Sequence, residues 1–409
     1  MGGKLLRLAS VVLWAAALPA WAQGVGWRGD GTGRYTEAEP PTQWDIDDGT
    51  NILWQTEVGK GQSSPVVVGR RIFVTAEPDV LLCLERDNGE VLWRSGNGYD
   101  ALTTEFRPPL DERARAHKDC GYAVPTPVAD QGSVFASFGS GVVACYDHDG
   151  RRRWIRYFDR KVVPEYGRTA SPVLAGAKLL VSLGGLLALD PQSGESLWET
   201  PGVKPSYGTP AVARIAETDV VITPNGDCVR VADGRTLASK MGKLEYPSPL
   251  VRGRVVFFVG QPAVALELPE RAAENVQPEK LWETDELEGE FYASPVYHEG
   301  VLYGVSNEGV LYALDAENGE IVFQKELEIG SAGGMPGIEY ANIYGSLTLA
   351  GKVMLLTNDG GETLVLAPGR QYRELSHNYL DQGSGASPVA DGKLLLLRGG
   401  GKLYGLGRR

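Results

Sequence analysis

The feature that most constrains this chain is an internal repeat. In each copy a small hydroxyl residue, usually followed by proline, precedes apolar runs that are separated by glycine turns, and most copies end near an aromatic residue. The eight copies begin at Ser64-Pro65, Thr126-Pro127, Ser171-Pro172, Thr209-Pro210, Ser248-Pro249, Ser294-Pro295, Ser346-Leu347 and Ser387-Pro388. Successive prolines are 62, 45, 38, 39 and 46 residues apart, and then 93 across the seventh copy, which has none. Because periods of about 40–50 residues with four short β-rich runs are typical of propellers, the sequence predicts an all-β fold, an eight-bladed β-propeller of four-stranded antiparallel blades.

The last copy is incomplete, because the chain ends shortly after its third apolar run. A candidate for the missing strand lies at the other end of the sequence. Residues 51–57, NILWQTE, resemble the last run of other copies, such as residues 196–200, SLWET. We expect this N-terminal strand to complete the last blade and close the ring, which would remove an open sheet edge. Residues 51–409 would then form a single propeller, with residues 23–50 as an N-terminal tail.

The first 22 residues have the features of an export signal peptide. Lys4 and Arg7 supply positive charge, residues 8–18 are mostly apolar, and residues 20–22 form an A-x-A cleavage site. The alternative interpretation is a buried N-terminal helix. No cysteine follows the cleavage site, so we expect no lipid anchor, and no later apolar stretch has the length of a transmembrane helix. The sequence therefore predicts a periplasmic or secreted protein with no transmembrane segment.

Charge and cysteine spacing exclude several classes of partner and site. A net charge of −12 argues against a nucleic-acid partner, which would require basic patches. Cys83, Cys120, Cys145 and Cys228 match no zinc or CxxC spacing, so we assign no metal site and interpret them as buried small apolar residues. A disulfide that involves Cys120 remains open. We expect a monomer.

A second pattern lies within the repeats. Residues 188–198, ALDPQSGESLW, fit A-x-D-x-x-[ST]-G-x-x-x-W, and residues 83–93 and 313–323 keep this spacing with substitutions. Asp, Asn and Gly suit a tight hairpin turn, and the following aromatic can pack against the neighbouring blade. The pattern resembles the tryptophan-docking repeat of the pyrroloquinoline-quinone-like (PQQ-like) propeller family, over roughly residues 51–409. Residues 27–33 and 122–128 are similar to exported bacterial members, and the chain also resembles the propeller lipoprotein of the outer-membrane assembly machinery.

The resemblance implies two classes of function. The first is an exported propeller that acts as a scaffold or binding module for a protein partner or a cell-envelope ligand, without catalysis. The alternative is a PQQ-dependent dehydrogenase with a divergent site at the channel mouth. Methanol-type members of the family carry adjacent cysteines, a catalytic Asp and a calcium site, and none of these can be matched here residue by residue. We therefore assign no catalytic residue and expect no cofactor, with PQQ and calcium belonging to the alternative.

Aromatic residues recur just before the repeat proline, at the expected mouth of the central channel. The candidate binding residues there are Tyr122, Arg168, Tyr207, Tyr246, Tyr292 and Tyr344. They could hold a flat ligand or a peptide, or they could fill the mouth as structural plugs. A third possibility, an enzyme that acts on a sugar or polymer, would need paired carboxylates, for which Glu245 and Glu290 are the candidates.

The long first period contains an insert at about residues 96–120. Its end is locally basic on an acidic protein, and Arg107 and His117 are further binding candidates. Long loops on a rigid scaffold often carry function. The insert could cap the channel, contact a partner or be a solvated surface loop.

Overall fold

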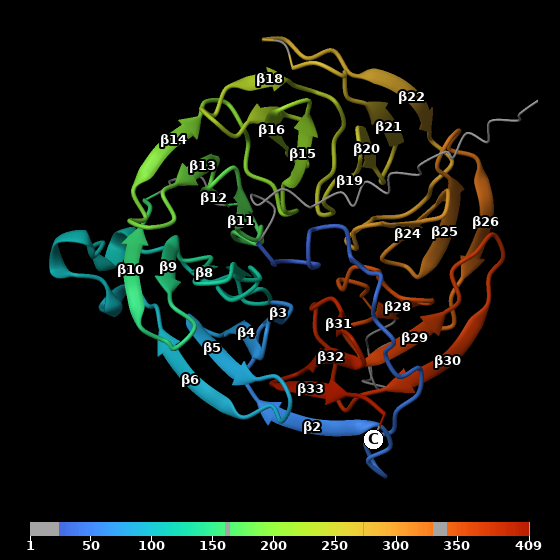
Figure 1. The fold of residues 1–409 in the computed structure, drawn as a ribbon, viewed down its shortest axis with the longest axis horizontal. Helices are drawn as coiled ribbons and strands as arrows, with labels where there is room; N and C mark the ends of the chain where they lie inside the picture. The colour runs from blue at the N-terminus through green and yellow to red at the C-terminus, as the bar shows by residue number, and fades with distance from the viewer. Residues whose placement is uncertain (1–23, 160–163, 273, 330–341, 409) are drawn as a thin grey trace, which may run out of the picture.

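The computed structural model describes residues 24–159, 164–272, 274–329 and 342–408, which form a ring of β-sheets around a central channel (Figure 1). In this part of the chain there are eight sheets, each built on four antiparallel strands, and one of them gains a fifth, parallel strand from residues Arg34–Tyr35. In seven of these sheets the four strands follow sequence order from the channel to the perimeter, and in the eighth a strand from the N-terminal end of the chain lies at the perimeter (Figure 1). The prediction of an eight-bladed, all-β propeller is confirmed. The predicted signal peptide, residues 1–22, lies outside the described residues.

The first four blades contain the following strands. Blade 1 has β3 (Val66–Val68), β4 (Arg71–Ala76), β5 (Val80–Glu85) and β6 (Val91–Gly96). Blade 2 has β7 (Val128–Ala129), β8 (Val134–Ser137), β9 (Val142–Tyr146) and β10 (Arg152–Tyr157). Blade 3 has β11 (Val173–Ala175), β12 (Lys178–Ser182), β13 (Leu186–Leu189) and β14 (Ser196–Thr200). Blade 4 has β15 (Ala211–Ile215), β16 (Thr218–Ile222), β17 (Cys228–Arg230) and β18 (Thr236–Ala238).

The last four blades continue the same order. Blade 5 has β19 (Leu250–Arg252), β20 (Val255–Phe258), β21 (Ala263–Glu267) and β22 (Glu279–Thr284). Blade 6 has β23 (Val296–His298), β24 (Val301–Val305), β25 (Val310–Asp315) and β26 (Ile321–Glu326). Blade 7 has β27 (Thr348–Ala350), β28 (Val353–Thr357), β29 (Glu362–Leu366) and β30 (Glu374–Tyr379). Blade 8 has β31 (Val389–Asp391), β32 (Leu394–Gly399) and β33 (Lys402–Leu406), with β2 (Ile52–Glu57) as its outer strand.

The ring closes through the N-terminal strand, as predicted. Strand β2 pairs antiparallel with β33, with Gln55 opposite Tyr404. The junction of blades 8 and 1 is also held by the buried guanidinium of Arg398. Its Nη1 donates to the carbonyl oxygens of Ser63 and Thr75 at 3.0 and 2.9 Å, and its Nη2 donates to Gly59 O at 2.9 Å. Arg398 therefore ties the last blade to the segment that enters the first.

The hydrophobic core lies between the blades. Each of the eight core clusters in the described residues combines side chains from two neighbouring blades. Between blades 6 and 7, for example, Val305 and Leu311 belong to one cluster with Leu356 and Leu364. A single blade thus has no core of its own, and it buries its apolar faces only when it is flanked on both sides.

The tryptophans dock against neighbouring blades, as the sequence predicts. Trp154 of blade 2 covers the glycine turn of blade 3, where its Nε1 donates to Pro191 O at 2.9 Å. A Cβ atom at Gly194 in that turn would lie 2.6 Å from Trp154 Cε3, so the turn needs glycine both for space and for its φ of +71°. Equivalent hydrogen bonds are made by Trp93, Trp198 and Trp282. The A-x-D-x-x-[ST]-G-x-x-x-W pattern is therefore a contact between blades.

Residues 24–50, ahead of β2, cross one face of the ring (Figure 1). Val25 forms a bridge with Ala129 of blade 2, and β1 (Arg34–Tyr35) then pairs parallel with β27 of blade 7. The guanidinium of Arg28 is 1% exposed, and its Nη2 donates to Pro295 O at 2.7 Å and to Leu347 O at 2.9 Å. This N-terminal segment therefore joins blades that are far apart around the ring.

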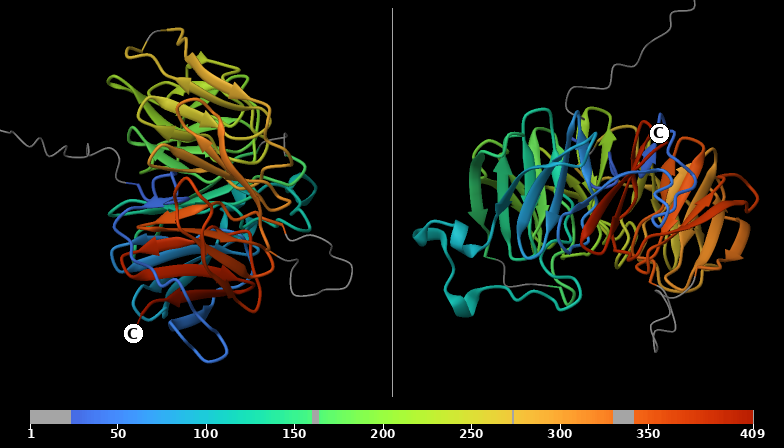
Figure 2. Two further views of the ribbon diagram at one scale, coloured as in Figure 1. Left: turned by 90° about the vertical axis from the view of Figure 1, so that its right-hand side faces the viewer. Right: turned by 90° about the horizontal axis from the view of Figure 1, so that it is seen from below.

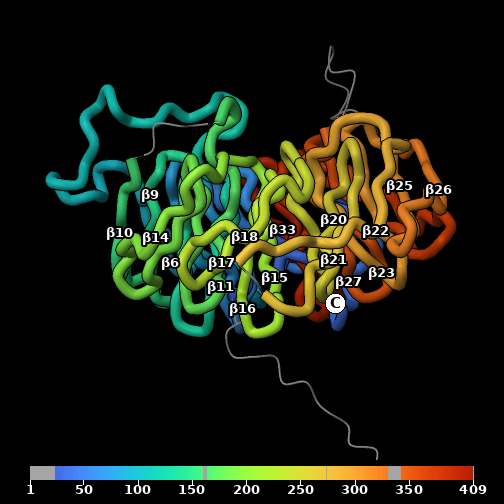
Figure 3. Tube along the Cα trace, turned by 90° about the horizontal axis from the view of Figure 1, so that it is seen from above, coloured from blue at the N-terminus to red at the C-terminus, as the bar shows by residue number. Residues whose placement is uncertain are grey.

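The insert after β6 projects from the opposite face (Figures 2 and 3). It contains three short 3-10 helices, η1 (Tyr99–Ala101), η2 (Thr104–Phe106) and η3 (Leu110–Glu112). No helix among the described residues is both long and apolar enough to span a membrane.

The four cysteines, all within the described ranges, are unpaired. Cys83, Cys145 and Cys228 are fully buried, as predicted, and burial raises the pKa of each thiol to about 12.

Candidate functional site

A closed ring of hydrogen bonds surrounds the central channel. The hydroxyl residue that opens each repeat uses its backbone N–H to donate to the hydroxyl of its counterpart in the next blade. The ring runs through Ser64, Thr126, Ser171, Thr209, Ser248, Ser294, Ser346 and Ser387 and returns to Ser64, with distances of 2.8 to 3.0 Å. Each blade is thereby hydrogen-bonded to both of its neighbours at the channel wall. We call these eight residues the hydroxyl ring.

The hydroxyl ring lines a cavity of about 660 Å³. Each ring residue is at most 7% exposed. Each hydroxyl accepts from a backbone amide, and its own proton has no acceptor among the described residues. The ring therefore presents eight O–H donors to the cavity, and buried donors of this kind require an acceptor from water or a ligand.

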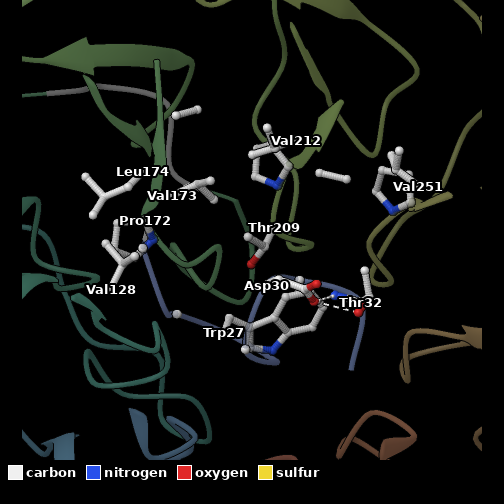
Figure 4. Close-up of a pocket in the computed structure, with 18 residues that line it drawn as sticks. Trp27, Asp30, Thr32, Val128, Pro172, Val173, Leu174, Thr209, Val212 and Val251 are labelled. Carbon is white, nitrogen blue, oxygen red and sulfur yellow. Dashed lines mark hydrogen bonds between the residues drawn. The ribbon is translucent and has the colours of Figure 1, made fainter. Parts of the chain in front are cut away.

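The cavity has a floor and a mouth. Trp27, from the N-terminal segment, lines it from one side, and the Arg28 guanidinium lies 5.2 Å from the centre of the Trp27 ring. Burial lowers the pKa of Arg28 to about 10, so the guanidinium stays charged at neutral pH. On the far side of Trp27 a separate pocket of about 140 Å³ lies against Asp30, Thr32 and the inner strands of blades 3 to 5 (Figure 4). Trp27 and Thr209 thus line both the larger cavity and this smaller pocket.

Five tyrosines form a continuous wall at the mouth, and we call them the tyrosine arc. Its members are Tyr166, Tyr207, Tyr246, Tyr292 and Tyr344, and all of them line the cavity. Neighbouring ring centres are 5.7, 5.2, 4.5 and 5.3 Å apart in that order. Tyr166 and Tyr344, at the two ends, are 39% and 41% exposed, so the arc is open to solvent. These geometries are typical of favourable aromatic pairs.

Carboxylates accompany the arc. The Tyr292 hydroxyl donates to Glu290 Oε2 at 2.8 Å. Burial raises the pKa of Tyr246 to about 12, and the nearby charges of Glu245 and Glu290 act in the same direction. Burial also raises the pKa of Tyr344, and Asp359 and Asp119 add to that effect. Carboxylates are therefore close to the phenols along the arc.

The structure brings together four of the predicted mouth residues, Tyr207, Tyr246, Tyr292 and Tyr344, and leaves two others outside the cavity wall. Arg168 is 5% exposed, and its Nη1 donates to Gly139 O at 2.9 Å, so its head group holds a turn of blade 2.

Tyr122 also lies outside the cavity wall. It is half-buried, and its hydroxyl donates to Ala114 O within the insert. Tyr122 stands before Pro125, whereas the repeat proline of blade 2 is Pro127, and the matching position is Val124, which does line the cavity.

The two insert candidates have different surroundings. Arg107 bonds within the insert, where its Nη2 donates to Asp100 O at 3.0 Å and to Leu102 O at 3.1 Å. The ring of His117 lies 5.2 Å from that of Tyr166, edge to face, and so continues the aromatic wall. The insert therefore reaches the cavity through its C-terminal end.

The end of the insert is anchored by Glu77. This carboxylate accepts hydrogen bonds from the backbone N–H groups of Tyr122 and Ala123, at 2.9 and 2.6 Å to Oε1. Burial raises the pKa of Glu77, and these two hydrogen bonds oppose the rise. The anchored segment brings Asp119 and Cys120 to the cavity wall. The insert thus partly caps the mouth.

Several cavity residues, Tyr166, Asp119 and Asp359 among them, were not predicted from the sequence. Asp359 is half-buried and accepts from the backbone N–H of Asn342 at 3.1 Å, and burial raises its pKa. Asp119 and Tyr166 lie in connections between blades and Asp359 lies in the turn between β28 and β29, at positions that no repeat landmark identifies. Tyr166 precedes Arg168 of the third copy by two residues, and this position was the sequence feature that could have identified it as a cavity residue.

The oxygen ligands that the described cavity residues offer fit a calcium-bound quinone poorly. Calcium takes six to eight oxygen ligands, several of them carboxylates. The carboxylates on the described cavity wall are Asp119 and Asp359. Among the described residues, no group of three or more His, Cys, Asp and Glu side chains is arranged to hold a metal ion.

Comparison with known proteins identifies relatives of this arrangement. The family model described as outer membrane protein assembly factor BamB matches residues 12–118, 42–325 and 271–409. The BamB of Burkholderia pseudomallei strain K96243 is 26% identical over 354 aligned residues, which cover 76% of this chain and 86% of that protein.

Solved structures share the fold. The BamB of Moraxella catarrhalis superposes with a TM-score of 0.59 at 13% identity, over 86% of this chain and 99% of that one. The computationally designed Ika8 protein gives 0.60 at 10% identity, over 87% and 99%. A europium-containing methanol dehydrogenase gives 0.60 at 13% identity, over 90% and 88%. At these identities the likeness shows the fold alone.

Proposed function

Because the chain belongs to the family of the outer membrane protein assembly factor BamB, we propose that it is an exported scaffold that binds a protein partner of an outer-membrane assembly machinery. Export would use residues 1–22 as a cleaved signal peptide and would place the chain in the periplasm or outside the cell, as a monomer. Sequencing the N-terminus of the exported protein tests the signal, with Gln23 expected as the first residue.

The observation that carries the binding role is the tyrosine arc around a cavity that opens on one face. Rigid aromatic side chains with a hydroxyl group are enriched at protein interfaces, because they bury a large area at a low entropic cost. Tyr166 and Tyr344 are both more than one-third exposed. The insert, which projects on the side of the ring away from the N-terminal segment (Figure 3), adds two exposed apolar side chains, Phe106 at 57% and Leu110 at 80% exposure. We propose that the partner docks on this face.

A photo-crosslinking amino acid at position 166 or 344 tests the proposal in the bacterium that encodes the chain. We expect crosslinks to a component of the outer-membrane assembly machinery. The matched control is position 379, because Tyr379 is 54% exposed on the perimeter strand β30. Equal crosslinking of that component from position 379, or none from 166 and 344, would count against docking at the mouth.

The alternative is a PQQ-dependent dehydrogenase with a divergent site at the mouth. It is favoured by the cavity itself, which is lined by stacked tyrosines and by the half-buried carboxyl of Asp359. The small number of carboxylates on the described cavity wall, Asp119 and Asp359, argues against a calcium-bound quinone. Calorimetric titration of PQQ into the purified protein, with and without calcium, separates the two. Saturable, calcium-dependent binding near one-to-one stoichiometry would support the dehydrogenase.

A further inference from the structure

We propose that the mouth cavity binds a basic loop of a polypeptide, whose Arg or Lys side chain lies on the tyrosine arc and whose backbone carbonyls reach the hydroxyl ring. This inference rests on the proposed function, because it specifies the chemistry of the segment that docks. Three features of the cavity carry it: the charge along the arc, the unpartnered donors of the ring and the depth of the cavity.

The arc is suited to a cation. Tyrosine faces attract ammonium and guanidinium groups, and the attraction grows when the cation leaves water. Carboxylates stand along the arc, since Glu290 accepts from the Tyr292 hydroxyl at 2.8 Å and both Glu245 and Glu290 act on Tyr246. Asp119 and Asp359 line the cavity wall itself. Among the described residues on that wall, Lys60 is the opposing cation, and it is exposed. Charge complementarity therefore favours a basic ligand.

The hydroxyl ring is suited to a ligand group that accepts hydrogen bonds. Below the arc, the eight O–H groups of the hydroxyl ring belong to residues that line the cavity, and each of these residues is at least nine-tenths buried. None of them has an acceptor among the described residues. Each oxygen already accepts from an amide, which strengthens its hydrogen as a donor. A simple organic cation offers no acceptor, whereas a peptide backbone offers a carbonyl oxygen at every residue. The ring therefore favours a polypeptide over a small cation.

The cavity has room for such a loop and a single route in. A volume of about 660 Å³ lies within the range of sites that enclose a small ligand. Because Trp27 and the N-terminal segment lie across the other end of the cavity, we infer that a bound segment enters and leaves by the mouth. The tip of a hairpin or a tight loop meets this requirement.

Fluorescence anisotropy with labelled hairpin peptides tests the inference on the purified chain. One probe carries an Arg-Asn-Gly-Arg tip, a second has glutamates in place of the arginines, and free arginine amide serves as a small-cation competitor. We expect the arginine hairpin to bind, the glutamate hairpin to bind at least tenfold more weakly, and arginine amide to compete poorly. Raising the salt concentration should weaken binding, because Asp119, Glu245 and Glu290 are exposed.

Variants locate the site. The double change Glu245→Gln with Glu290→Gln, and separately Tyr246→Ala, should each weaken the arginine hairpin about tenfold. Glu279→Gln on β22 and Tyr379→Ala on β30 are the matched perimeter controls, and they should change affinity less than twofold. Circular dichroism of each variant confirms that it remains folded.

Several results would overturn the inference. These are equal binding of the two hairpins, no binding of the arginine hairpin to the wild-type chain, affinity that survives the carboxylate and tyrosine changes, or arginine amide binding as tightly as the hairpin. The crosslinking test has a separate readout. If position 344 gives crosslinks but the arginine hairpin does not bind, the scaffold function is retained and the proposed basic loop is rejected. If the arginine hairpin binds but no crosslinks form, the preference for a basic loop is retained and the proposed partner from the assembly machinery is rejected.

Discussion

Docking of Trp282 between blades 5 and 6 should contribute a large share of the stability of that junction. The side chain is 7% exposed, its ring lies 6.2 Å from that of Phe257, and its Nε1 donates to Ala316 O at 3.0 Å. Truncation to alanine removes this burial, leaves a cavity and deprives the carbonyl of its partner. Buried Trp→Ala changes typically cost about 3–5 kcal/mol, and we expect Trp282→Ala to lower the free energy of unfolding by that amount.

Two further variants separate burial from the hydrogen bond. Trp282→Phe keeps an aromatic ring but loses the N–H donor, and Phe323 occupies the equivalent position of blade 6. We expect this change to cost about 1–2 kcal/mol. Leu281→Ala, on the neighbouring residue at 41% exposure, is the control, with an expected change within about 0.5 kcal/mol. Urea unfolding followed by far-ultraviolet circular dichroism measures all three. If Trp282→Ala costs no more than Leu281→Ala, the docking argument is wrong.

Three other changes test the turns, the ring closure and the insert anchor. Gly194→Ala should cost about 2–4 kcal/mol, because its φ is +71° and its Cβ would meet Trp154; Gly202→Ala, with φ of +80° and open space, should cost about 1–2 kcal/mol in the same unfolding assay. Arg398→Met should cost at least about 2 kcal/mol in thermal or urea unfolding, because buried carbonyls lose their donor. Burial raises the pKa of Glu77 above its ordinary 4.5, so the stability from this carboxyl is present below pH 4.5 and is lost as the pH rises through the raised value. Glu77→Gln should therefore flatten the pH dependence of unfolding above pH 4.5, and an unchanged slope would contradict the assigned shift.

The blades were predictable because recurring residues mark the strands and turns of the repeats. Proline marks the start of the inner strand in seven copies, glycine marks most of the turns, and in three copies a tryptophan follows the last glycine by four residues, at Trp93, Trp154 and Trp198. Even the seventh copy, with Leu347 in place of proline, could be placed by its glycine turn and its β-rich runs. The closing strand β2 was recognisable because it repeats the pattern of the outer strands.

Contacts between residues far apart in the sequence were not predictable. Arg28 and Arg398 bond carbonyls that are hundreds of residues away; Arg28 lies ahead of the repeats, and Arg398 lies in β32 of the eighth copy. An arginine that will be buried looks the same in the sequence as one on the surface. Glu77 is similar, because its partners are backbone amides at the end of an insert of irregular length.

The candidate site was predictable where the repeat supplies a register, and this explains how the fold and the mouth are connected. The residue three positions before the repeat proline, or before Leu347 in blade 7, lines the cavity in all eight blades. In chain order these residues are Gln62, Val124, Thr169, Tyr207, Tyr246, Tyr292, Tyr344 and Gly385. In the same register, each residue of the hydroxyl ring lies one position before the repeat proline or Leu347. The hydroxyl groups that accept hydrogen bonds from the neighbouring blade are therefore also the O–H donors of the cavity. The scaffold is nearly symmetric, but this rim position is tyrosine in four consecutive blades and smaller or non-aromatic in the other four. A ligand in the channel therefore meets an aromatic wall on one side and smaller or non-aromatic side chains on the other, and that asymmetry arises from single residues on an otherwise repeated frame.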